Sequence, residues 1–201
     1  MIILLGGHSG AGKSTICGAA VQELGITHRR MFADVERMAL ERHWGKQEKL
    51  NHWNALLALW ANDIAGVSPE ITLLVETHFV LQPTAGAQAF QKRSFQIGIP
   101  ITSSIPTEVF REIGTTKHDV VIVLLTTTET CTVERLETIG QETPIPRVQA
   151  EREAEHRCWQ ETHERALQFL GARRVAAHTL ANTGSPSETV GSLRAIMRGA
   201  L

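Results

Sequence analysis

The segment from Ile2 to Thr15 constrains the fold more than any other part of the chain. It begins with the apolar run Ile2–Leu5, continues through a glycine-rich loop and enters a stretch of helical composition. A short run of aliphatic residues is typical of a strand buried on both faces in a parallel sheet. A strand, a tight glycine turn and a helix in direct succession therefore predict the first unit of an α/β fold.

The loop of this unit matches the pattern G-x-x-x-x-G-K-[ST] over its whole length. Its glycines let successive backbone N–H groups turn inward around a phosphate, and the helix N-terminus adds partial positive charge. Lys13 would reach the β- and γ-phosphates, and the Ser14 hydroxyl would ligate Mg²⁺. The structural alternative is a glycine-rich turn without a ligand. We predict a site for ATP with magnesium, formed by Gly7, His8, Ser9, Gly10, Ala11, Gly12, Lys13, Ser14 and Thr15.

The class of nucleotide-binding protein is narrowed by two missing patterns. The sequence has no Asn-Lys-x-Asp segment for guanine recognition and no Asp-x-x-Gly segment after a predicted strand. With 201 residues, the chain is also short for an ATPase with separate sensor regions. A small phosphotransferase is therefore the leading interpretation.

The rest of the chain alternates between strand-like and helical segments. Such alternation predicts a parallel, doubly wound sheet in one domain that spans residues 1–201. The Gln82–Pro100 stretch interrupts it and is expected to be an extended excursion. The expected strands are 2–5, 28–32, 71–75, 120–125 and 175–178, and the expected helices are 13–24, 34–42, 47–65, 106–113, 130–137, 147–170 and 187–198.

Composition limits the partners of the protein. The net charge is -1, so no overall field attracts nucleic acid or an anionic membrane, and we expect neither as a partner. No window approaches the roughly 20 apolar residues of a spanning helix. The three cysteines lack metal-type spacing and are interpreted as reduced thiols in a cytoplasmic protein. The nine histidines show no ligand spacing either, so we expect no metal site built from them.

Four segments occur in the order found in one known family. They are the phosphate loop, Leu74–His78 (similar to Val-Asp-Thr-His), Gly98–Pro100 leading to Glu108–Phe110, and Asp119–Leu124 followed by Glu134–Leu136. On these segments the chain resembles the archaeal-type adenylate kinases, a branch of the P-loop nucleoside monophosphate kinases.

The resemblance implies a three-layer P-loop kinase fold with a five-stranded parallel sheet flanked by helices. It also implies phosphoryl transfer from Mg-ATP to a nucleoside monophosphate, with AMP as the first candidate, and it allows a homo-oligomer. The chain departs from the family pattern at Glu76, where the family has Asp. The lid near residues 138–150 also lacks arginines in its middle.

Three residues are the candidate catalytic cations, because phosphoryl transfer depends on positive charge around the moving group. They are Lys13, Arg135 and Arg147. Arg135 resembles the arginine that lies against the ATP base in the family, and Arg147 follows the lid. A helix-face salt bridge and an exposed charge are the structural alternatives for the two arginines. Arg152 and Arg157 are interpreted as surface charge pairs.

Four residues are the candidate acceptor groups. Glu76 ends a buried strand, where a carboxylate can hold a magnesium-bound water or orient the acceptor. His78 would bind the acceptor phosphate or polarise it. Asp34 would contact the acceptor or position magnesium, and Arg37 would take the acceptor phosphate, because the family has its acceptor-binding helices in the region 33–65. Strand-end and helix capping, a structural histidine and a solvated helix face are the alternatives.

Two other functions remain open at this stage. The arginine-poor lid and the 82–100 stretch favour a kinase for another small-molecule acceptor, such as a nucleoside, a sugar or a cofactor precursor. The same lid favours, in a different class, an ATP-binding regulatory protein with little turnover.

Overall fold

A computed structural model describes residues 1–45, 48, 51–81 and 102–199. The predicted excursion at 82–100 lies outside these residues. The described chain forms a central sheet with the strand order β2-β3-β1-β6-β7, and every neighbouring pair is parallel. The strands are β1 (Ile2–Gly6), β2 (Thr27–Arg30), β3 (Leu73–Glu76), β6 (Val120–Thr126) and β7 (Val175–Ala181). The predicted five-stranded parallel sheet is confirmed.

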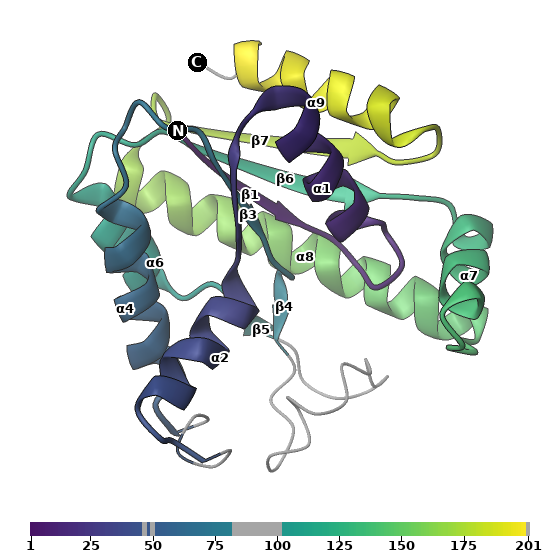
Figure 1. Cartoon of the computed structure of the whole chain (residues 1–201), viewed down its shortest axis with the longest axis horizontal. Helices are drawn as coiled ribbons and strands as arrows, with labels where there is room; N and C mark the ends of the chain where they lie inside the picture. Colours follow the sequence, from purple (N-terminus) through teal and green to yellow (C-terminus); the bar gives the residue numbers. More distant parts are fainter. Residues whose placement is uncertain (46–47, 49–50, 82–101, 200–201) are drawn as a thin grey trace.

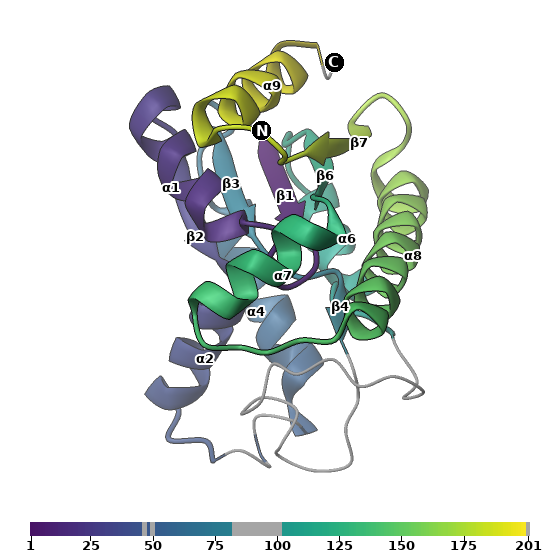
Figure 2. The same cartoon turned by 90° about the vertical axis from the view of Figure 1, so that its right-hand side faces the viewer.

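Helices cover both faces of this sheet and complete the three layers (Figures 1 and 2). Side chains of β1 alternate between two cores, because successive residues of a strand point to opposite faces. Ile3 and Leu5 pack toward α1 (Lys13–Leu24) and α9 (Pro186–Gly199). Ile2 and Leu4 pack toward the opposite core, which is contributed by α2 (Met31–Glu41), α4 (Trp53–Ala65), α6 (Thr107–Gly114) and α8 (Ile145–Leu170).

Element boundaries differ from the expectations at a few points. The predicted strand 28–32 is too long, because α2 begins at Met31 directly after β2. Within the described residues the predicted helix 47–65 is continuous only from Trp53. Trp53 and Trp60 are buried, as their helical spacing predicts. Between α7 (Glu129–Thr138) and α8 only residues 139–144 are non-helical, so half of the expected lid region belongs to α8.

A second, two-stranded antiparallel sheet pairs β4 (Val80–Leu81) with β5 (Thr102–Ser103). These strands were not predicted, because two residues are too few to show an alternating pattern. Within the described part of the chain, no helix combines the length and the apolar character needed to cross a membrane.

Candidate active site

The phosphate loop joins β1 to α1 at the edge where the parallel strands end, which is where α/β proteins bind ligands. Gly10 (φ 78°) and Gly12 (φ 91°) adopt left-handed backbone conformations that other residues rarely accept. A side chain at Gly12 would also collide with Asn182. The glycines of the motif are therefore required both by the turn and by the packing around it.

Lys13 is buried and donates hydrogen bonds back to its own loop, to the carbonyl oxygens of Gly7 (2.6 Å) and His8 (3.1 Å). Its Nζ also lies 3.4 Å from Nδ1 of His78. Burial lowers the pKa of Lys13, and the nearby carboxylates, with Glu155 the strongest, oppose that shift. The structure thus brings His78, a predicted acceptor residue, next to the predicted phosphate-binding lysine.

Ser14 and Glu76, the two predicted magnesium ligands, are in direct contact. The Ser14 hydroxyl donates to Oε1 of Glu76 over 2.6 Å. Mg²⁺ binds hard oxygen ligands and reaches them in part through its own water molecules. A hydroxyl and a carboxylate side by side at the strand edge therefore fit this cation.

Two carboxylates of α8 lie at the phosphate loop. Oε1 of Glu151 accepts the backbone N–H of Ser9 at 2.7 Å. Oε1 of Glu155 lies 3.2 Å from His78 Nδ1, while its Oε2 accepts the N–H of Phe79. Burial would raise the pKa of Glu155, but the contacts with His78, Lys13 and Phe79 outweigh it and hold the pKa below its ordinary value. Negative charge thus already lies where the motif predicts phosphate.

His8 is the only histidine of the motif and is almost fully buried. Its Nε2 lies 2.9 Å from the hydroxyl of Thr132 on α7. Burial, supported by the positive charges of Lys13 and Arg152, lowers its pKa to about 4. His8 therefore remains neutral at ordinary pH. A groove of about 600 Å³ opens beside it, with Thr126, Glu129, Gln149, Arg152 and Glu155 in its walls.

Arg135 lies against the phosphate loop. Its guanidinium donates to the carbonyls of Ala11 (3.1 Å), Gly10 (3.3 Å) and Asn182 (3.3 Å). Asn182 in turn donates to Ala11 over 2.7 Å and accepts from Thr189. These contacts hold the loop from outside and fix the Arg135 side chain over it. The predicted role of Arg135 at the ATP base is compatible with this position.

The other predicted arginines do not reach the phosphate loop in the described contacts. Nε of Arg147 is buried without a hydrogen-bond partner. Arg152 pairs with Glu129 at 3.3 Å, in line with its interpretation as a charge pair. The catalytic role of Arg147 stays a prediction.

On the predicted acceptor side, which comprises the region 33–65 and the neighbouring Arg29, cations and carboxylates form ion pairs with one another. Arg29 donates to Asp34 and to Asp63, each over 2.7 Å. Arg37 pairs with Glu41 at 2.7 Å and lies 4.0 Å from Asp34. The predicted acceptor residues Asp34 and Arg37 therefore lie together, but neither carries an uncompensated charge.

Sequence reasoning missed several residues around the loop. Thr132, Glu151 and Asn182 contact it directly, and Glu155 contacts His78, which neighbours Lys13; each lies more than a hundred residues further along the chain than the loop. Glu151 and Glu155 stand four apart on one helix face, and their burial in the structure marks them as different from the exposed glutamates of α8. That burial is invisible in a sequence in which neighbouring positions of the helix are also charged.

Comparison with solved structures identifies the fold. The shikimate kinase of Aquifex aeolicus superposes with a TM-score of 0.52 at 14% identity, over 100% of this chain and 98% of that chain. TT1252 from Thermus thermophilus superposes with a TM-score of 0.52 at 17% identity, over 98% of this chain and 96% of that chain. The shikimate kinase of Acinetobacter baumannii in complex with shikimate superposes with a TM-score of 0.51 at 12% identity, over 99% of this chain and 93% of that chain. No protein-family model matches the sequence, and no curated protein matches it. The chain has the fold of the P-loop kinases.

Proposed function

We propose that this protein is a phosphotransferase that moves the γ-phosphate of Mg-ATP to a small-molecule acceptor. The observation that carries the proposal is the complete phosphate loop together with the Ser14–Glu76 contact of 2.6 Å at its end. The kinase fold supports it. Bound magnesium would neutralise the charge of the β- and γ-phosphates.

The residues of this chain would then divide the work of binding and orientation. Lys13 would exchange its two carbonyl partners for oxygens of the β- and γ-phosphates. Ser14 and Glu76 would hold magnesium and its water molecules. Arg135 would contact the nucleotide beside the loop that it already supports. His78, next to Lys13, would face the acceptor.

For the acceptor, we infer a hydroxyl-bearing small molecule without a phosphate group. A nucleoside monophosphate needs a cation free to bind its phosphate. Arg29 and Arg37 instead already pair with Asp34, Asp63 and Glu41. AMP, the acceptor implied by the resemblance to adenylate kinases, is the competing candidate.

A coupled assay of ADP release, run over an acceptor panel, tests the proposal. The panel holds the common nucleoside monophosphates, nucleosides, sugars and polyhydroxylated carboxylic acids. We expect ATP-dependent turnover on the order of 1 s⁻¹ or faster with one class of hydroxyl acceptor. Lys13→Ala should lower this activity by at least about 100-fold, because it removes a cation that acts on the transferred group.

Two outcomes of the panel would overturn the proposal in different ways. Turnover confined to AMP would support the adenylate kinase alternative and reject the inferred acceptor. Binding of ATP without turnover on any acceptor would favour the regulatory alternative, for which the α8 carboxylates at the loop are the supporting observation. Equal activity of wild type and Lys13→Ala would point to a contaminating kinase.

A further inference from the structure

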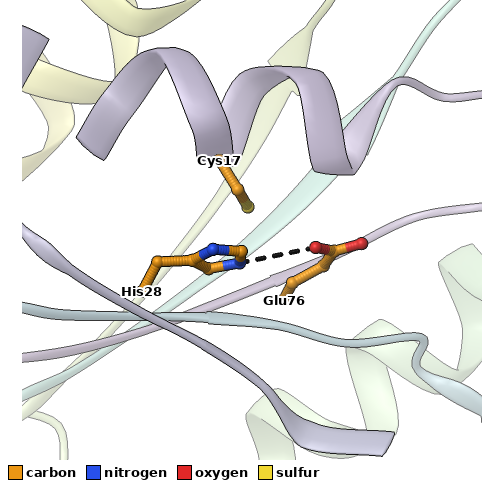
Figure 3. Close-up of side chains that lie close together, drawn as sticks. All are labelled: Cys17, His28 and Glu76. Atoms are coloured by element: carbon orange, nitrogen blue, oxygen red, sulfur yellow. Dashed lines mark ion pairs between the residues drawn. The ribbon is translucent and has the colours of Figure 1, made fainter. Parts of the chain in front are cut away.

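A thiol, an imidazole and a carboxylate converge behind the phosphate loop, on the α1 side of the sheet. Cys17, His28 and Glu76 each offer one ligand atom, and these atoms all lie within 4.8 Å of one another. Figure 3 shows the Cys17 side chain descending from α1 toward the His28 and Glu76 side chains. Three elements, α1, β2 and the more distant β3, thus supply one side chain each.

The register of the sheet explains why the two strand residues meet. Residues His28 and Arg30 of β2 stand opposite Leu74 and Glu76 of β3. His28 and Glu76 therefore share one sheet face, because side chains alternate along a strand. Leu74 belongs to the core that α1 covers, and Cys17 is a buried member of the same core. The cluster is thus a product of the fold rather than of local sequence.

Two polar atoms of the cluster have no hydrogen-bond partner although they are buried. They are Nε2 of His28 and Oε2 of Glu76, which lie 3.4 Å apart. Glu76 is nine-tenths buried, and its other oxygen is already held by Ser14. Buried polar groups without partners are costly, so such a pair needs an explanation. Both atoms belong to side chains whose ligand atoms lie within 4.8 Å of the Cys17 thiol.

We propose that Cys17, His28 and Glu76 form a binding site for a zinc ion. Sulfur, nitrogen and oxygen together are the ligand types that zinc accepts, at about 2.0–2.3 Å from the ion. Ligand atoms around tetrahedral zinc are then roughly 3.3–3.8 Å apart, so the His28–Glu76 distance needs no change. The widest pair needs to close by about 1 Å, which a small side-chain rotation provides. Binding releases the thiol proton of Cys17 to solvent.

The surroundings of the site leave one coordination position open and bring one competing cation close to it. Three protein ligands leave a fourth position for water, as in zinc sites that are open to exchange. Arg30 lies 3.5 Å from Oε2 of Glu76 and competes with the ion, but its side chain is half exposed and free to turn to solvent. The site uses Oε2 of Glu76, whereas the proposed magnesium site uses Oε1. It extends the proposed function and does not depend on it.

Metal titration of the full chain tests the site without an activity assay. Metal-free protein is titrated with Zn²⁺ in competition with a chromogenic chelator, and separately with Co²⁺, whose bond to a thiolate gives a charge-transfer absorption. We expect one equivalent of each metal in wild type and the cobalt–thiolate absorption on Co²⁺ addition. Cys17→Ser and His28→Gln should each weaken zinc binding by at least about 100-fold, because each removes a direct ligand.

Cys158→Ala is the matched control, because Cys158 is also a buried thiol but lies on α8, outside the cluster. It should bind zinc as wild type does. The proposal is overturned if wild type binds no zinc, if it gives no thiolate absorption with Co²⁺, or if Cys158→Ala loses binding as Cys17→Ser does. The proposal is also overturned if Cys17→Ser, folded as wild type by circular dichroism, keeps the cobalt–thiolate absorption, because that signal would then come from Cys131 or Cys158. His28→Gln answers the same question where Cys17→Ser fails to fold.

Discussion

The phosphate loop and the acceptor side of this protein hold their polar groups in different ways. The loop is fixed by contacts from far along the chain, such as Thr132 to His8 and Asn182 to Ala11. On the acceptor side, Arg37 pairs within its own helix with Glu41, four residues away, and both side chains are about half exposed. The loop is thus held by tertiary contacts, whereas Arg37 on the proposed acceptor side is neutralised within its own helix.

This contrast has an energetic meaning. Buried hydrogen bonds and charges depend strongly on protonation and on the loss of a partner. Exposed pairs at a helix surface contribute only about 0.3–0.5 kcal/mol each. Perturbations of the loop should therefore have large effects, and perturbations of the acceptor-side pairs small ones.

The largest expected effect is the pH dependence of stability that arises from His8. Its pKa is about 4 in the folded protein and 6.5 in the unfolded chain. Between these values the unfolded chain binds more protons, so the free energy of unfolding falls as the pH falls. We expect His8 to account for a loss of about 2 kcal/mol between pH 7 and pH 5.

Urea unfolding at both pH values measures this loss. His8→Gln removes the titrating group and should reduce the difference between the two pH values by about 2 kcal/mol. His163→Gln, which replaces a partly exposed histidine of α8, is the matched control. If wild type and His8→Gln lose the same free energy of unfolding between pH 7 and pH 5, protonation of His8 does not destabilise the buried loop, and the contrast with the exposed pairs fails.

A smaller effect is expected from Glu151, which accepts the N–H of Ser9 in the loop. Glu151→Gln removes a negative charge that competes with phosphate and keeps a neutral acceptor there. Charge-assisted hydrogen bonds are roughly twice as strong as neutral ones, so we expect ATP to bind about 3–10-fold more tightly. Isothermal titration calorimetry measures the change.

The matched control is Glu153→Gln, which removes the same charge from an exposed position on the same helix. It should change ATP affinity by less than about twofold. If Glu151→Gln binds ATP no better than Glu153→Gln, the carboxylate does not compete with phosphate. The loop would then bind ATP without any displacement of α8 residues.

The smallest effect is expected from Arg37→Ala on the acceptor side. Loss of an exposed ion pair should change stability by less than about 0.5 kcal/mol and the acceptor KM by less than about twofold. Steady-state kinetics with the acceptor found in the panel provide the measurement. A tenfold or larger rise in KM would mean that Arg37 binds an anionic acceptor group, which would return AMP to first place.

The sequence was sufficient for the features that depend on local patterns. Apolar runs such as Val120–Leu125 identify buried strands, and the glycine spacing identifies the phosphate loop. The sheet and its parallel strands followed from the alternation of elements. Ser14 and Glu76 were each predicted as magnesium ligands, because both residues follow or end strands at the same sheet edge, but their direct contact was not predicted.

What the sequence did not reveal depends on pairings between distant segments. The charge of Glu151 was indistinguishable from that of Glu153, because only helix packing decides which one is buried. Histidine spacing argued against a metal site, yet His28 meets Cys17 and Glu76 through strand register. The pairing of Arg29 with Asp63 joins β2 to α4 and has no local signature.

The sheet order also governs when during synthesis this protein becomes able to bind a nucleotide. β1 is made first, but its two neighbours, β3 and β6, end only at residues 76 and 126. Ala11 is held by Asn182, 171 residues further on. Domains generally fold as units, and long-range pairing is slow. We therefore expect the nascent chain to carry a phosphate loop without its outer support until residue 182 has left the ribosome.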